Sequence, residues 1–305
     1  MERRDHYYAA AVPSEDRMWF AGSGGKIVAV DRAGRTELLK TPTDKTLQDM
    51  ALWDSRRGVA VGNDGVVLQT ADGGKTWTAA ANVPRSQVAN KLNRVRVADG
   101  GLAVATGEMG ALLVSRDYGA TWERLRPEED VAWNDVAILP GGRLVAVGEF
   151  GRIVASGDAG HTWSEIKGPV QSSLMAVSFR DDRHGVAAGL EGAVLLTRDG
   201  GQHWDKLDLG HHDHLFDIAW DAGGQRWIGT GSLGRWVSIG ADGASLKTGR
   251  LDERDLSWHT RVLPAGREIW FAGANVGRWD GTHWQPLADA KAASAPVKAN
   301  PEKTP

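Results

Sequence analysis

The stretch GVAVGNDGVVLQTADGGKTW, residues 58–77, decides the fold because it holds two different turns between short apolar runs. The first turn is Gly-x-x-Gly, here GNDG, and the second has the form Asp-x-Gly-x-Thr-Trp. Runs such as GVAV and VVLQ have the length of short β-strands, and glycines that accept positive φ allow tight hairpins between them. The stretch therefore predicts consecutive antiparallel strands.

The Gly-x-x-Gly turn recurs about every 41 residues along the chain. Its first glycines are Gly22, Gly62, Gly107, Gly148, Gly189, Gly231 and Gly273, and the last turn, GANVG, has one extra residue. Each turn has an apolar run on both sides, a further strand-like run upstream and a short one downstream, as in WERL. Four strands in about 41 residues make one propeller blade. The sequence thus predicts an all-β fold, a seven-bladed β-propeller of four-stranded antiparallel blades.

The repeats divide the chain into one domain and a tail. Residues 1–287 are assigned to the propeller, with approximate blade limits 6–40, 46–83, 92–126, 131–168, 173–209, 214–250 and 256–287. Residues 288–305 are rich in Ala, Pro and Lys, which predicts a disordered tail. Residues 6–12 already supply the inner strand of blade 1, and residues 284–287 supply the outer strand of blade 7. We therefore expect the ring to close by side-chain packing.

The Asp-x-Gly-x-Thr-Trp turn, in which His replaces Thr in blade 5, is expected between the third and fourth strands of blades 2–5. Its aspartates and tryptophans are Asp72, Trp77, Asp117, Trp122, Asp158, Trp163, Asp199 and Trp204. A turn aspartate accepts hydrogen bonds from nearby amides, and a tryptophan that folds back buries a large ring between blades. These aspartates are interpreted as structural, not catalytic.

Composition narrows the function classes. The 305 residues carry a formal net charge of −3 and no stripe of Lys or Arg, which argues against nucleic-acid binding. No apolar run is long enough to span a membrane. The lack of cysteine excludes disulfides and thiolate chemistry, and it fits an exported protein, although a cytoplasmic one is also compatible. The N-terminal MERRDHYYAAAV has no apolar signal segment, so an export segment would not be part of this chain.

The four turns, each about a dozen residues after a Gly-x-x-Gly pair, resemble the Asp-box or BNR repeat. With GVAVGNDGVVLQTADGGKTW they make residues 6–287 similar to the photosystem II assembly and stability factor family of BNR propellers. The resemblance implies an exported, non-enzymatic propeller, periplasmic in a bacterium, that binds a protein partner, often a membrane-associated one. We expect a monomer. The Arg-rich partner face of that family has no counterpart that can be mapped onto this sequence.

The working face is expected around the central channel, where Gly-x-x-Gly turns and blade-to-blade connections meet. Alignment of the innermost strands predicts one column at its mouth: Tyr8, Asp49, Arg94, Asp135, Ala176, Asp217 and His259. The hairpin tips add Asn63, Asp64, Glu108, Met109, Glu149, Phe150 and Glu191. Seven carboxylates then face one arginine, and crowded like charges repel. We therefore predict an acidic, partly aromatic mouth that binds a partner.

A histidine-rich connection, GHHDHLFD at residues 210–217, leads into blade 6 on the same face. Imidazoles beside carboxylates can hold a divalent transition metal, which makes His211, His212 and His214 candidate ligands. A solvated polar loop is the alternative, because the run lacks a defined ligand geometry. No other cofactor is expected.

Two other functions remain open. A sialidase-like glycoside hydrolase would need an arginine cluster for its substrate carboxylate, and the column holds only Arg94 and Tyr8 of the required set. A glycosidase that uses two of Asp49, Asp135 and Asp217 is conceivable, because paired carboxylates can act as acid and base or nucleophile. A carbohydrate- or metal-binding module is the third alternative.

Overall fold

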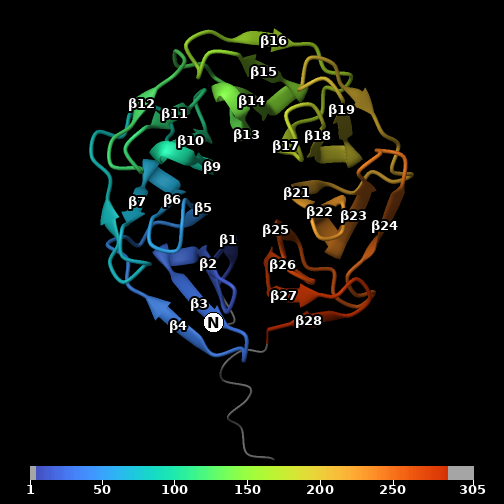
Figure 1. Ribbon diagram of the computed structural model, residues 1–305, viewed down its shortest axis with the longest axis horizontal. Helices are drawn as coiled ribbons and strands as arrows, with labels where there is room; N and C mark the ends of the chain where they lie inside the picture. Colours follow the sequence, from blue (N-terminus) through green and yellow to red (C-terminus); the bar gives the residue numbers. More distant parts are fainter. Residues whose placement is uncertain (1–4, 288–305) are drawn as a thin grey trace, which may run out of the picture.

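The computed structural model describes residues 5–287; residues 1–4 and 288–305, and with them the predicted tail, lie outside the described part. Seven blades surround a central channel, and the first blade, in blue, lies beside the last, in red (Figure 1). Each blade is one sheet of four antiparallel strands in sequence order. The predicted seven-bladed β-propeller is confirmed.

The strands follow one order from the channel outwards. The innermost strands are β1 (Tyr7–Ser14), β5 (Leu47–Leu52), β9 (Leu92–Ala98), β13 (Trp133–Leu139), β17 (Leu174–Phe179), β21 (Leu215–Asp221) and β25 (His259–Ala265). The second strands are β2 (Arg17–Gly22), β6 (Gly58–Gly62), β10 (Leu102–Gly107), β14 (Arg143–Gly148), β18 (Gly185–Gly189), β22 (Arg226–Gly231) and β26 (Glu268–Gly273). The third strands are β3 (Ile27–Asp31), β7 (Val67–Thr70), β11 (Leu112–Ser115), β15 (Ile153–Ser156), β19 (Val194–Thr197), β23 (Arg235–Gly240) and β27 (Val276–Trp279). The outermost strands are β4 (Thr36–Leu39), β8 (Thr78–Ala79), β12 (Glu123–Arg124), β16 (Ser164–Ile166), β20 (Asp205–Lys206), β24 (Leu246–Arg250) and β28 (Trp284–Pro286).

Short 3-10 turns join some of these strands. They are η1 (Ser23–Gly25), η2 (Asn63–Gly65), η3 (Asp99–Gly101), η4 (Pro140–Gly142), η5 (Glu149–Gly151), η6 (Leu190–Gly192) and η7 (Ser232–Gly234). Within residues 5–287, no helix has the length and apolar character needed to cross a membrane.

The two glycines of a Gly-x-x-Gly turn serve different purposes. Gly231, the first glycine in blade 6, has an extended φ of −169°. A Cβ there would lie 1.8 Å from the carbonyl oxygen of His214, so only glycine lets the hairpin approach the start of β21. The second glycine, Gly234, has a φ of 65°. Positive φ, expected of the glycines in general, therefore belongs to the second one.

The turn aspartates act as expected. In blade 4 the Thr162 amide donates to Asp158 Oδ1 at 2.8 Å, and the Ser156 hydroxyl donates to the same oxygen at 2.8 Å. Side-chain and backbone hydrogen bonds from Thr162 lower the pKa of Asp158 to about 2. Equivalent amide bonds hold the aspartates of blades 2, 3 and 5, which are Asp72, Asp117 and Asp199.

The tryptophans of these turns pack between blades, as predicted. Trp77 of blade 2 lies edge-on to Trp19 of blade 1, with ring centroids 6.0 Å apart. Trp122 and Trp204 lie in clusters that join their own blade to the preceding one, and Trp163 packs against such a cluster while partly buried. The core of the molecule is thus divided among the seven interfaces between blades.

The ring closes by packing between the first and last blades. Among the strands of residues 5–287, none from blade 7 belongs to the sheet of blade 1. Instead, Phe20 of β2 packs against Trp270 of β26 with ring centroids 5.7 Å apart, within one buried cluster that both blades share. The predicted closure by side chains is confirmed.

Candidate functional site

A β-bulge opens the innermost strand of every blade. In β13, for example, Trp133 pairs with Gly148 and Asp135 with Val147, so Asn134 is skipped by the pairing. The same irregularity occurs in all seven blades. The skipped residues, which we call the mouth ring, are Tyr8, Gln48, Asn93, Asn134, Met175, Phe216 and Thr260.

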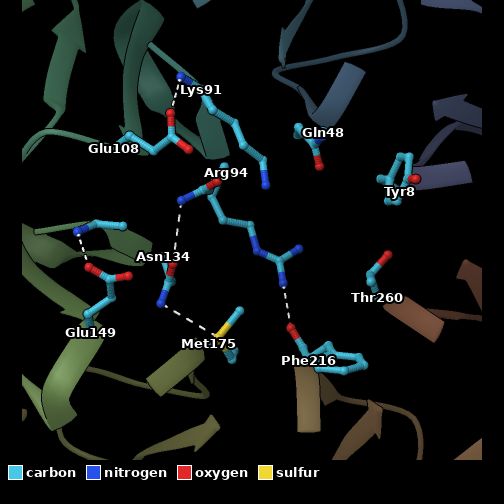
Figure 2. A pocket seen from close by; sticks show the side chains of 12 residues that line it. Tyr8, Gln48, Lys91, Arg94, Glu108, Asn134, Glu149, Met175, Phe216 and Thr260 are labelled. Carbon is cyan, nitrogen blue, oxygen red and sulfur yellow. Dashed lines mark hydrogen bonds between the residues drawn. The ribbon is translucent and has the colours of Figure 1, made fainter. Parts of the chain in front are cut away.

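The mouth ring lines a cavity of about 370 Å³ at one end of the channel (Figure 2). Glu108 and Glu149, at the Gly-x-x-Gly hairpins of blades 3 and 4, also line it, together with Lys91, Arg94 and Ala132. The cavity therefore opens on the face that carries these hairpins, as the sequence predicted. Because a bulge turns one extra side chain out of the ladder, all seven blades contribute to its wall.

Amide side chains link neighbouring blades around the cavity. Asn134 Nδ2 donates to the Leu174 carbonyl at 2.9 Å, and Asn93 Nδ2 donates to the Trp133 carbonyl at 3.3 Å. The third bond stays within blade 2, where Gln48 Nε2 donates to Asn63 Oδ1 at 3.0 Å. The amide nitrogens are thus occupied by protein acceptors, which leaves the wall rich in side-chain oxygens.

Below the mouth ring, six ionised side chains fill the channel. We call this group the ion cluster; its members are Asp49, Arg94, Arg96, Asp135, Asp217 and Arg261. Arg94 Nη2 lies 3.1 Å from Asp217 Oδ1, and Arg96 Nη2 lies 2.7 Å from Asp135 Oδ2. Three carboxylates and three guanidinium groups balance in charge.

Each aspartate of the ion cluster also binds the backbone of the next blade. Asp49 Oδ2 accepts the Val95 amide at 3.0 Å, and Asp135 Oδ2 accepts the Val177 amide at 3.0 Å. Asp217 Oδ2 accepts the Val262 amide at 2.8 Å. These carboxylates therefore fasten adjacent innermost strands to one another.

The prediction of an acidic mouth is wrong for these three carboxylates. Asp49, Asp135 and Asp217 are at most 2% exposed. Burial raises the pKa of Asp217 to about 6, while the Arg94 and Arg96 guanidinium groups favour its ionised form. The repulsion between crowded carboxylates had suggested a binding partner, but neighbouring arginines relieve it. The carboxylates also lie too deep to contact a partner.

The two ends of the predicted column are also misplaced. Asp49, Asp135 and Asp217 are each the first residue after the skipped one, and we call this position the level of the ion cluster. In blade 1 that level is occupied by Ala9, whereas Tyr8 is the skipped residue itself and lies in the mouth ring. In blade 7 the level belongs to Arg261. His259 is 1% exposed, its Nε2 lies 2.8 Å from Asn275 Oδ1, and its ring packs edge-on to nearby aromatic rings of blade 7. It is a core residue and does not reach the mouth.

The hairpin tips divide into two groups. Glu108 and Glu149 reach the cavity, and each fixes a backbone amide: Glu108 Oε2 accepts that of Lys91 at 2.9 Å, and Glu149 Oε2 that of Ala132 at 2.8 Å. The other tips lie outside the cavity. Asp64 pairs with Lys45 at 2.7 Å, Glu191 accepts the Ser172 hydroxyl at 2.6 Å, and Phe150 is 69% exposed.

The three candidate metal ligands turn to different partners. His211 Nε2 lies 3.1 Å from Thr248 Oγ1, and His214 Nδ1 accepts the Glu191 amide at 2.9 Å. His212 Nδ1 lies 3.4 Å from the Glu191 carbonyl. Across residues 5–287, no group of three or more histidines and carboxylates is arranged to hold a metal ion. Metal binding by this loop stays a prediction.

Sequence reasoning missed most of the mouth ring and two arginines of the ion cluster. Five of the missed residues directly precede the residue that was aligned in their strand, and Thr260 follows the aligned His259, so only Tyr8 was found; the missed residues are Gln48, Asn93, Asn134, Met175, Phe216 and Thr260. The signal was present, because five of these six are polar or aromatic directly after the first residue of a buried strand. Arg96 was missed because the alignment considered one position per strand, and Arg261 was missed because the alignment selected His259 in blade 7.

Comparisons with known proteins agree with the fold and the repeats. The family model described as photosynthesis system II assembly factor YCF48 matches residues 28–165 and 155–231, from blade 1 into blade 6 and more than half of the chain. A structure of YCF48 bound to a D1 peptide has a TM-score of 0.71 and 16% identity, over 88% of this chain and 89% of that one. YCF48 from Cyanidioschyzon merolae has a TM-score of 0.70 and 13% identity, over 90% and 94%.

A propeller of another family matches equally well in shape. The WD40 domain of Doa1 has a TM-score of 0.73 and 11% identity, over 90% of this chain and 92% of that one. Likeness at such identities shows the fold alone, and no curated protein sequence matches the chain. The family rests on the sequence model, which confirms the resemblance drawn from the repeats: the chain belongs to the photosystem II assembly factor YCF48 family.

Proposed function

We propose that the chain is a non-enzymatic scaffold for protein assembly that holds a protein partner on the face around the channel mouth. Its membership of the YCF48 family supports this role, as does a YCF48 structure that carries a D1 peptide. We further propose that the partner is membrane-associated and that the protein works outside the cytoplasm as a monomer, a setting that suits a chain of 305 residues without cysteine.

The observation that carries the proposal is the make-up of the cavity. Its wall combines amide oxygens with the Tyr8 and Phe216 rings, and both kinds of group recur where proteins bind peptides. Seven blades each supply one side chain, so the mouth can be varied without disturbing the core.

A glycosidase is disfavoured by the placement of its candidate acids. Asp49, Asp135 and Asp217 are buried and hydrogen-bonded to backbone amides of the next blade. A catalytic carboxyl must touch the glycosidic oxygen or the anomeric carbon, which buried residues below the mouth ring do not reach.

Site-directed photocrosslinking tests the proposal, and the cysteine-free chain makes it simple. A cysteine in place of Phe150, on the hairpin face, is labelled with benzophenone maleimide. The labelled protein is then irradiated in an extract of the source cells. A matched cysteine replaces Lys75 in the Asp turn of blade 2, on the opposite face. We expect one protein adduct from the Phe150 position and none from Lys75. Equal labelling from both faces would refute the proposed binding face.

A further inference from the structure

The cavity holds hydrogen-bond donors that the protein does not use. Both side-chain bonds of Arg94, to the Phe216 carbonyl at 2.8 Å and to Asp217 at 3.1 Å, come from Nη2. Within residues 5–287, its Nε and Nη1 have no acceptor, although the side chain is only 6% exposed. The Lys91 ammonium also has no acceptor in the described part of the chain, and it points to the middle of the cavity near Arg94 (Figure 2).

Such donors attract an anion. Nε and Nη1 lie on different edges of the guanidinium group, so each can donate a separate hydrogen bond to a carboxylate, and the nearby ammonium adds a third donor. These donors face the cavity, and hydrogen bonds between charged groups are stronger than neutral ones, so a carboxylate that meets them gains binding free energy. The neighbouring amide nitrogens of Asn93 and Asn134 are not free to donate to such a ligand, because both already donate to backbone carbonyls.

The opposite side of the cavity carries two aromatic rings. Tyr8 and Phe216 lie across from Glu108 and Glu149, and Met175 lies beside Phe216 (Figure 2). An apolar group attached to the carboxylate would pack there. The volume of about 370 Å³ suits one or two amino-acid residues, not a folded domain.

The acidic side chains at the rim restrict where a carboxylate can sit. Glu108 and Glu149 are held by the amides of Lys91 and Ala132, and they repel an anion near the hairpins. A ligand carboxylate is thereby directed to Arg94 and Lys91 at the centre of the channel.

We propose that this cavity binds a carboxylate joined to an apolar side chain, as at the C-terminal residue of a polypeptide. The inference rests on the proposed function, which makes a partner's chain end the expected source. A free small carboxylic acid has the same chemistry and is the other source.

Titration calorimetry with defined probes tests the inference without the natural partner. The probes are N-acetyl-Ala-Phe with a free carboxylate, its C-terminal amide, and a longer peptide with the same two last residues. We expect the free acid to bind at least tenfold more tightly than the amide. Lys91→Gln should lower the ratio of acid affinity to amide affinity about tenfold. Phe216→Ala should lower the affinity for the acid as well. Lys167→Gln, an exposed lysine in the connection after β16, is the matched control and should change nothing.

The outcomes separate this inference from the proposed function. Equal binding of acid and amide, or no binding of either, overturns the carboxylate site, whereas crosslinking from the hairpin face would still report a partner. Binding of both the short acid and the longer peptide supports a chain end. Binding of the short acid alone overturns the chain end and assigns the cavity to a small carboxylic acid.

Discussion

Removing one carboxylate of the ion cluster should be among the most costly single changes to this protein. Asp135 is 0% exposed and accepts four hydrogen bonds. Arg96 donates two of them, at 3.0 and 2.7 Å, and the amides of Val136 and Val177 donate the others, at 2.8 and 3.0 Å. Asp135→Ala therefore strands two buried amides in two blades and leaves a guanidinium group without its counter-ion.

The magnitude follows from these losses. Each orphaned buried amide costs roughly 1–3 kcal/mol, and removing one partner of a buried ion pair costs about 3–5 kcal/mol. The side chain of Arg96 is 32% exposed, so water hydrates part of its charge and the losses do not add fully. We expect Asp135→Ala to lower the free energy of unfolding by about 3–5 kcal/mol.

Urea unfolding measures this loss against a matched aspartate. Asp117→Ala removes a carboxylate from an exposed turn, where water replaces its partners, and should cost about 1–2 kcal/mol. In the Asp135→Ala background, Arg96→Met should cost less than in the parent protein, because the ion pair is already broken. If a folded Asp135→Ala protein is no less stable than Asp117→Ala, the carboxylate does not fasten the blades and the reasoning fails.

Three further predictions concern the blades. Trp122→Ala should lower the free energy of unfolding by about 3–5 kcal/mol, because it leaves a cavity between blades 2 and 3; urea unfolding that matches the parent protein would contradict this. Gly231→Ala should give little folded protein by circular dichroism, because its Cβ would meet the His214 carbonyl at 1.8 Å; a normal spectrum and melt would count against the close approach. Asp158→Asn should be less stable than the parent above pH 3.8, and the gap in Tm should close as pH falls through about 2, because the lowered pKa of Asp158 gives stability that protonation removes; a gap independent of pH would refute this.

The blades could be predicted because local chemistry alone determines them. A first glycine such as Gly231 is required by the approach of one backbone to another, whatever lies elsewhere in the molecule. A turn such as that of Asp158 satisfies its amides within a few residues. The glycine pair repeats seven times, which gave the number of blades, and the Asp turn recurs in the same register in blades 2–5.

The site could not be predicted as well because it depends on single-residue register. A bulge displaces every side chain after it by one position, and the only mark of where it falls in the innermost strands is a polar or aromatic residue directly after the first strand residue, which Met175 does not share. In blade 7 the turn between the first two strands is short, with Ala265 paired to Glu268. This short turn shifts the residues of the innermost strand once more relative to the first glycine. Alignment of the strands by their apolar residues therefore selected His259 in place of Arg261.

The bulge also explains why acids gather in this channel without forming a binding site. Innermost strands of neighbouring blades do not pair, so the amides of Val95, Val177 and Val262 find no strand acceptor at the channel. A carboxylate from the preceding blade supplies one, and each buried carboxylate then needs a guanidinium group across the channel. Acids and arginines at this level are coupled by the packing of the ring, so the three carboxylates are not available to a ligand, whereas Arg94 also lines the cavity and keeps side-chain donors there that have no protein acceptor within residues 5–287. The skipped residue, one position earlier, is released from the ladder and is free to vary, so recognition in this propeller is best sought at the mouth ring.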